Sequence, residues 1–261
     1  MGILNLTPDS FSDGGLWMDS ERAVARAVAM DEEGADIIDI GGESTRPGSL
    51  PVSEDEELRR VMPVIERLAA CLNVPLSIDT TRSNVARCAL SAGVEIVNDI
   101  SGLTFDAGMA ATVAANHAGL VVMHTRGRPE VMQNDTFYHG VVNEVCSGLA
   151  VAVQRALSAG MSAEQVVVDP GIGFGKDRAG NLELLRSLCD LHVLGRPLLV
   201  GTSRKGFTGT VAGRTVDNRL FTTAATVALA VANGARVLRV HDVAAMRDVA
   251  DMAWEIARGH F

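Results

Sequence analysis

Short apolar runs alternate with amphipathic segments along the whole chain. Runs rich in Val, Ile and Leu predict strands at residues 3–6, 37–40, 76–78, 96–98, 120–123, 166–168, 198–201 and 237–240. Apolar residues at helical spacing predict helices at residues 20–33, 53–72, 83–91, 107–116, 141–159, 181–194, 219–233 and 243–258. Ser53 and Glu56 form a capping-box pattern, and glycine follows several of the other helices.

Eight strand–helix units predict a closed parallel barrel. A (β/α)8 TIM barrel needs eight such units in roughly 250 residues. A doubly wound open sheet is the alternative. No linker, low-complexity tract or change in composition divides the chain, so we expect one domain over residues 1–261.

Composition excludes several classes of function. The chain is 47% hydrophobic, but no apolar run reaches the ~18 residues of a membrane span. The net charge of −9 argues against nucleic acid as a partner. Cys71, Cys88, Cys146 and Cys189 are widely spaced with no CxxC pair, which favours reduced cysteines in a cytoplasmic protein.

Polar residues stand where nearly every predicted strand ends, and in such a barrel functional groups lie at the carboxyl ends of strands. Any one of them could be a helix cap or a turn residue, but together they predict a convergent polar rim. The rim residues are Asn5, Asp39, residues 43–46, Asp79 and Thr80, Asn98 and Asp99, His124, Asp169, residues 203–205, Arg239 and His241.

Three of these residues suit a flat, nitrogen-rich heterocycle. Asp79 and Asp169 offer carboxylates, which accept two parallel N–H bonds from an amidine-like edge. Asn98 offers an amide, which both donates and accepts. We expect all three to lie deep in the mouth of the barrel.

Other rim residues suit a phosphorylated ligand. Arg46, Arg239 and His241 supply positive charge and hydrogen-bond donors for a phosphate or diphosphate. Asn5 supplies a hard oxygen for Mg²⁺, which often takes one or two protein oxygens plus substrate phosphates.

The stretch DPGIGFGK, residues 169–176, resembles a nucleotide P-loop but is not one. Its first glycine would fall at Pro170, and Asp177 stands where Ser or Thr should bind Mg²⁺. We interpret it as a strand end followed by a glycine-rich turn against a ligand. Phe174 either projects into the site or caps the rim. Lys176 in this stretch and Lys205 are the only lysines in the chain.

Seven segments in order resemble one family. They are GILNLTPDSFSDGG (2–15), GGESTRPG (41–48), SIDTTR (77–82), VNDISG (97–102), DPGIGFGK (169–176), SRKGF (203–207) and RVHDV (239–243). Together they are similar to the dihydropteroate synthases of folate biosynthesis. The resemblance implies a TIM barrel that joins 6-hydroxymethyl-7,8-dihydropterin diphosphate to 4-aminobenzoate by dissociative substitution, giving 7,8-dihydropteroate and diphosphate. It also implies bound Mg²⁺, competition by sulfonamides and a homodimer formed through the last helices.

The resemblance carries roles over to individual residues. The pterin set is Asp79, Asn98, Asp169 and Lys205, and the Mg²⁺ ligand is Asn5. The diphosphate set is Thr45, Arg46, Arg239 and His241. The aminobenzoate set is Pro47, Phe174, Ser203 and Lys205, and the mobile first loop contains Phe11 and Asp13. Of these, Asp79, Asp169, Lys205 and Arg239 are expected to carry catalysis.

The chain departs from the family pattern in places. It starts at the first strand, without the usual short extension, and the loop after the fifth strand reads HTRGRP (124–129). Gly180 and Thr222 stand where His and Gly are usual.

Two alternatives to a synthase stay open. One is a non-catalytic pterin-binding paralogue, and the other is a pterin-dependent methyl-transfer module. Arg46, Lys205 and Arg239 argue against both, because a methyl-transfer module does not need diphosphate and aminobenzoate groups and a paralogue is free to lose them.

Overall fold

The strands of the computed structural model, which describes residues 1–7 and 15–258, form one parallel sheet in chain order. They are β1 (Gly2–Asn5), β2 (Ile38–Gly41), β3 (Leu76–Asp79), β4 (Ile96–Asp99), β5 (Gly119–Met123), β6 (Val166–Asp169), β7 (Leu198–Val200) and β8 (Ala235–Leu238). Phe11 and Asp13 lie outside the described residues.

The sheet closes between its first and last strands. Gly2 pairs with Val240 in a parallel bridge just beyond β8. The Ile3 N–H donates to the Val240 carbonyl across 2.9 Å, and the Val240 N–H donates to the Met1 carbonyl across 2.9 Å. The predicted (β/α)8 barrel is therefore confirmed, and the open doubly wound sheet is wrong.

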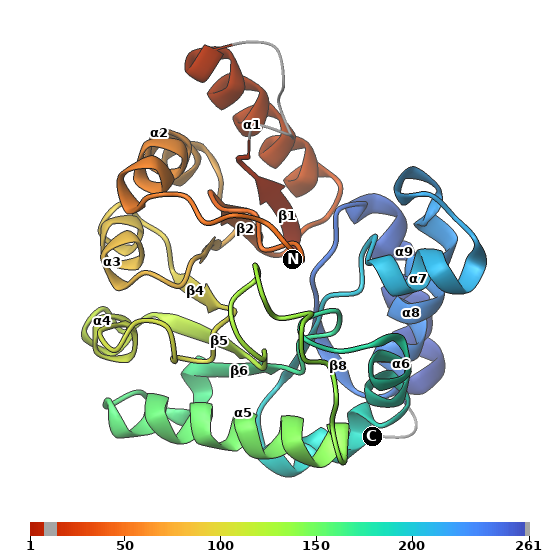
Figure 1. Ribbon diagram of the computed structural model, residues 1–261. Coiled ribbons are helices and arrows are strands. Elements are labelled where there is room, and N and C mark those ends of the chain that lie inside the picture. Colours follow the sequence, from red (N-terminus) through yellow and green to blue (C-terminus); the bar gives the residue numbers. More distant parts are fainter. Residues whose placement is uncertain (8–14, 259–261) are drawn as a thin grey trace.

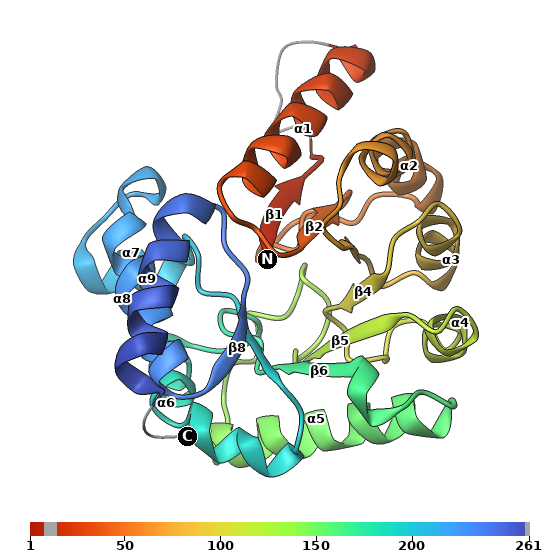
Figure 2. The ribbon, with the colours of Figure 1, turned by 180° about the vertical axis from the view of Figure 1, so that it is seen from behind.

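Helices surround the strands (Figures 1 and 2). They are α1 (Gly15–Glu32), α2 (Glu54–Cys71), α3 (Ser83–Ser91), α4 (Met109–Ala115), α5 (Val141–Ser158), α6 (Arg178–Arg186), α7 (Gly206–Ala212), α8 (Leu220–Ala232) and α9 (Val243–Ala257). Short 3-10 turns are η2 (Ala163–Gln165), η3 (Leu188–Leu194) and η4 (Val216–Asn218). None of the helices in these described stretches is long and apolar enough to cross a membrane.

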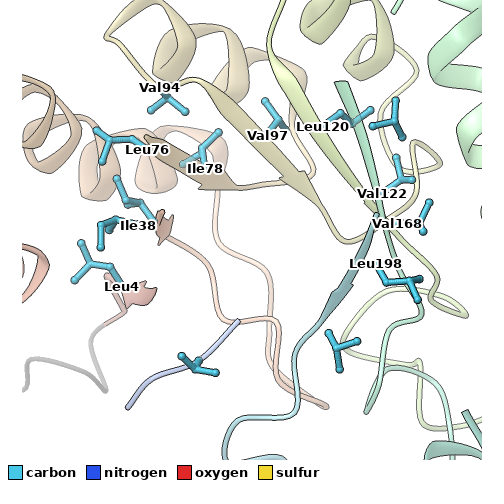
Figure 3. Close-up of a cluster of buried hydrophobic side chains, with 14 of the residues drawn as sticks. Leu4, Ile38, Leu76, Ile78, Val94, Val97, Leu120, Val122, Val168 and Leu198 are labelled. Atoms are coloured by element: carbon cyan, nitrogen blue, oxygen red, sulfur yellow. The ribbon is translucent and has the colours of Figure 1, made fainter. Parts of the chain in front are cut away.

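The core follows from the two-residue period of the strands. Successive register partners from β1 to β6 are apolar and buried: Leu4, Ile40, Ile78, Val97, Leu120 and Val166. Figure 3 shows part of this layer, passing from strand to strand. The neighbouring level of the sheet pairs Asp39 with Ser77, and both are fully buried. Because side chains alternate along a strand, apolar residues pack against the helices while polar ones face the barrel interior.

Several predicted elements differ in detail. The predicted helix at 181–194 divides at Ser187 into α6 and η3, and nothing in the structure explains the break. Helix α7 was not predicted, because glycine at positions 206 and 209 disfavours helix. Gly209 has a packing reason, since a Cβ there would lie 2.3 Å from Nε of Arg219.

The predicted capping box forms only in part. Ser53 accepts from the Glu56 N–H at 3.2 Å, as expected. The Glu56 carboxylate, however, binds Arg59 and Arg60 on the same helix. The start of α2 is therefore capped by one hydrogen bond and an adjoining ion-pair cluster.

Candidate active site

Four successive register partners, three of them with polar side chains, lie at one level at the carboxyl ends of β1 to β4. They are Asn5, Gly41, Asp79 and Asn98. Gly41 has no side chain, and a Cβ there would lie 3.7 Å from Oδ1 of Asn5 and 3.6 Å from Cβ of Asp79. The Asn5 amide and the Asp79 carboxylate therefore border one small gap in the rim.

A buried network connects β2, β3, β4 and the end of β8. The Arg239 guanidinium donates to Asp39 at 2.6 Å and to Asp79 at 2.7 Å. Asp39 also accepts from the Asn98 amide at 3.2 Å and from the Ser77 hydroxyl at 2.6 Å. Burial alone would lower the pKa of Arg239, but Asp39 and Asp79 outweigh it and raise that pKa above its usual value.

Asp79 keeps one oxygen without a partner. Its Oδ1 is buried and makes no hydrogen bond, the one such atom among the side chains that the structure describes. Burial raises the pKa of Asp79 to about 7, although Arg239 acts in the opposite direction. An orphaned buried acceptor is costly, so this oxygen is suited to receive an N–H from a ligand.

A second group forms around Lys205, the N-cap residue immediately before α7. Its Nζ lies 4.0 Å from the centre of the Phe174 ring. Asp169, the last residue of β6, is buried and accepts from the Gly171 N–H at 2.7 Å. Burial raises the pKa of Asp169 and lowers that of Lys205 to about 8.

A third group joins Ser203 to His241. The Ser203 hydroxyl oxygen lies 3.0 Å from Nδ1 of His241 and accepts from the His241 backbone N–H at 3.1 Å. Burial, with Arg204 and Arg239 nearby, lowers the pKa of His241 to about 4. His241 is therefore neutral near pH 7, so it offers a hydrogen bond rather than the expected positive charge.

The loop after β2 carries Thr45, Arg46 and Pro47 at the mouth of the barrel. Its Gly48 N–H donates to the Pro129 carbonyl at 2.9 Å, which ties it to the loop after β5. Arg46 is exposed and makes no ion pair with any described residue. It lies close enough to His241 to contribute to the lowered pKa of that ring. Within the described part of the chain, Arg46 is thus a rim cation without an acidic partner.

Residues 1–241 match the family model described as pterin binding enzyme. A dihydropteroate synthase from Synechocystis is 48% identical over 258 residues, covering 97% of this chain and 89% of that protein. The chain belongs to the dihydropteroate synthase family.

Solved structures of the family superpose closely on this chain. A dihydropteroate synthase from Clostridium difficile, crystallised in the presence of pteroic acid, has a TM-score of 0.94 and 44% identity, covering 99% of this chain and 96% of that chain. A dihydropteroate synthase from Xanthomonas albilineans with 4-aminobenzoic acid has a TM-score of 0.92 and 44% identity, covering 99% and 92% of the two chains.

Not every polar residue on the rim of this dihydropteroate synthase family member faces the mouth. Asp99 accepts from the N–H groups of Ser101 and Leu103, both at 2.8 Å, and so shapes its own loop. Leu103 has a φ of 64°, a conformation that the Asp99 hydrogen bond helps to hold. Asp99 is therefore a structural residue of the loop after β4.

Asp39 is the residue whose importance sequence reasoning missed. It was placed on the rim without a role, yet it accepts hydrogen bonds from three side chains and is fully buried. One signal was available: a charged residue within an otherwise apolar strand, two positions before Gly41 and therefore on the same face.

Proposed function

We propose that this chain is an active dihydropteroate synthase, which condenses 6-hydroxymethyl-7,8-dihydropterin diphosphate with 4-aminobenzoate to 7,8-dihydropteroate and diphosphate. The observation that carries the proposal is the buried, unpartnered Oδ1 of Asp79. Its other oxygen is held by Arg239, so the orphaned oxygen is fixed in place for a ring N–H of the pterin. Membership of the family supplies the reaction.

The pterin is bound by Asp79, Asn98 and Asp169, with Lys205 beside them. Asp39 holds the Asn98 amide and the Arg239 guanidinium, so two of the groups around the ring are oriented before the ligand arrives. Asp169 is oriented by the Gly171 N–H. Because these groups are already oriented, binding of the flat heterocycle costs little reorganisation of the protein.

The diphosphate lies toward the mouth, near Thr45, Arg46, His241 and Arg239. Arg46 supplies a positive charge that no described acidic residue pairs with, and His241 donates a hydrogen bond. Arg239 is occupied by two carboxylates and acts chiefly by aligning them.

The residues fit a Mg²⁺ ion that is held mainly by the substrate. The described part of the chain contains no group of three or more His, Cys, Asp or Glu side chains that could cage a metal. Asn5 offers one oxygen at the gap beside Asp79, and Mg²⁺ is often held by one or two protein oxygens together with phosphates and water. When bound, the ion would neutralise charge on the diphosphate.

The bond changes need no protein nucleophile. The C–O bond at the pterin methylene breaks, and its electron pair leaves with the diphosphate. The positive charge spreads into the ring, where Asp79 and Asp169 favour it. The arylamine nitrogen then attacks the methylene carbon and loses a proton. We place the aminobenzoate between Phe174 and Pro47, with its carboxylate near Lys205 and Ser203.

The test is diphosphate release from the pterin diphosphate with Mg²⁺, measured with and without 4-aminobenzoate. Release that depends on the aminobenzoate and yields dihydropteroate supports the proposal. Pterin binding without any release would refute the synthase and favour a non-catalytic paralogue. Methyl transfer from a methylated pterin would favour the third class.

We also propose a homodimer formed through the last helices. Helix α8 packs against α9, and the two expose large apolar side chains. Phe221 is 85% exposed, and Leu229, Met252 and Ile256 are also largely exposed. Exposed apolar groups of this size on two neighbouring helices suit an interface between two copies. The four free cysteines support a cytoplasmic location, and we take residues 1–261 as one domain.

A further inference from the structure

The glycine-rich loop after β6 is folded tightly against two neighbours. Gly171, Gly173 and Gly175 all have positive φ angles, of 69°, 85° and 57°. A Cβ on Gly171 would lie 2.0 Å from the His124 carbonyl oxygen, and one on Gly173 would lie 3.0 Å from Cδ of Lys205. Only glycine permits this path, which brings Phe174 over Lys205.

Lys176 turns inward and fills the centre of this loop. It is 3% exposed. Its Nζ lies 2.9 Å from the Phe174 carbonyl, 3.0 Å from the Gly171 carbonyl and 3.2 Å from the His124 carbonyl. His124 Nδ1 is also 3.2 Å away. Three carbonyls that can only accept surround a group with three protons to donate.

Such burial requires an explanation, because lysine is almost never fully buried without a charged partner. Lys176 makes no ion pair within the described part of the chain, and burial lowers its pKa to about 7, although the charge of Asp169 nearby acts in the opposite direction. Its position outside the substrate contacts named above means that the proposed reaction does not use it directly. What it does is join the end of β5 to both sides of the turn that carries Phe174.

We propose that Lys176 is a positioning residue for the arylamine, acting by fixing the Gly171–Phe174 turn so that the Phe174 ring stays against Lys205. This inference rests on the proposed function. Asp79 and Asn98, with Asp39 behind them, share no hydrogen bond with Lys176. Asp169 is the one residue of the pterin set that is tied to this turn, through the Gly171 N–H. Loss of the Lys176 bonds should therefore affect the arylamine more than the pterin.

The test compares Lys176→Met with wild type in the full chain. Met keeps a similar length and removes the donors. We expect KM for 4-aminobenzoate to rise at least about tenfold, because small misplacements of positioning groups have effects of this size. Pterin affinity by calorimetry should change less than about threefold, and Lys176→Arg, which keeps donors, should recover part of the loss.

A matched control separates positioning from stability. Ile65 is fully buried on α2, on the far side of the barrel from α6 (Figure 1). Ile65→Ala should lower the thermal midpoint without raising KM for 4-aminobenzoate. An unchanged KM in Lys176→Met, or equal losses for arylamine and pterin, would overturn the role. Wild type that binds pterin but forms no product would instead refute the proposed function, and this inference with it.

A measurement on wild type does not depend on how the variant folds. Because Lys176 and Lys205 are the only lysines, ¹⁵N-lysine labelling gives two side-chain signals, assigned with Lys205→Arg. We expect the Lys176 protons to exchange with water at least about ten times more slowly than those of Lys205. Equal exchange rates would show that the bonds around Lys176 are not maintained and would overturn the proposal.

Discussion

Arg239 donates from Nε to Oδ2 of Asp39 across 2.6 Å, joining two residues 200 positions apart in the chain. Asp39 is fully buried, and the same oxygen also accepts from Asn98. Through these bonds Asp39 sets the position of two groups that we propose to surround the pterin.

Asp39→Ala should therefore destabilise the protein and impair activity together. Removing one partner of a buried ion pair leaves the other charge uncompensated. This lowers the free energy of unfolding by about 3–5 kcal/mol. Urea unfolding measures this loss. Asp36→Ala is the control, because Asp36 is 80% exposed in its ion pair with Arg247 and should cost at most about 1 kcal/mol. Equal losses in the two variants would contradict the role of Asp39.

Asp79→Ala and Asp169→Ala should each lower turnover by at least about 10²-fold. This is the scale of losing one preorganised group that stabilises a developing charge. Steady-state kinetics of dihydropteroate formation measures the effect. Asp251→Ala, an exposed carboxylate on α9, should leave turnover unchanged. Turnover within a few-fold of wild type in either active-site variant would remove that residue from its assigned role.

Pterin binding should weaken in acid. Only the ionised Asp79 can accept from Arg239 with one oxygen and from a pterin N–H with the other, and burial raises its pKa to about 7. Below pH 7 protons compete with the ligand, so affinity should fall by about tenfold per pH unit. Calorimetry between pH 5 and 8, with a pterin analogue that does not titrate there, measures the slope. Asp79→Asn should bind weakly with a flat profile, and a flat wild-type profile would contradict the assignment.

Binding of 4-aminobenzoate should weaken in alkali. The pKa of Lys205 is lowered to about 8, so the ammonium that attracts the carboxylate is lost as pH rises through that value. KM for 4-aminobenzoate should rise above pH 8 in wild type and stay level in Lys205→Arg, whose side chain keeps its charge. Lys205→Ala should weaken both substrates. Unchanged KM values for both would place Lys205 outside the site.

Phe221→Asp should convert the proposed dimer to monomers. A carboxylate on α8 would have to be buried without a partner in an apolar interface. Sedimentation velocity at several protein concentrations measures the change. Val193→Asp is the control, since Val193 is 78% exposed but lies on η3 rather than on α8 or α9. A wild-type monomer, or a Phe221→Asp dimer of unchanged affinity, would contradict the interface.

The barrel and the polar rim could be predicted from the sequence because both depend on local periodicity. Eight apolar runs predict eight strands, and parallel strands place Asn5, Asp79 and Asp169 at one end whatever the details of packing. The charge of His241 could not be predicted in this way, since its pKa depends on burial and on Arg204 and Arg239 nearby. Local sequence patterns predict neither the burial of a side chain such as His241 nor the charges that surround it.

Long-range pairing explains the other omissions. Asp39 looked like one rim residue among many until Arg239 was placed beside it. In the sequence, Lys176 belongs to a stretch that resembles a nucleotide P-loop without matching it. One of its carbonyl partners, that of His124, comes near only because β5 and β6 are adjacent in the sheet. Helix α7 could not be predicted because glycines 206 and 209 disfavour helix, and Gly209 is needed for the close approach of Arg219.

The scarcity of lysine has a consequence for covalent labelling. Lys176 is almost entirely buried, and the Met1 amine donates to the Leu238 carbonyl. Lys205 is therefore the more accessible of the two side-chain amines, and its lowered pKa leaves more of it nucleophilic at neutral pH than an ordinary lysine. If Lys205 lies in the substrate pocket, as proposed, amine-reactive dyes that acylate it would block that pocket. Coupling at Lys205 would then inactivate the protein, and the rate of acylation would report how fully the pocket is occupied.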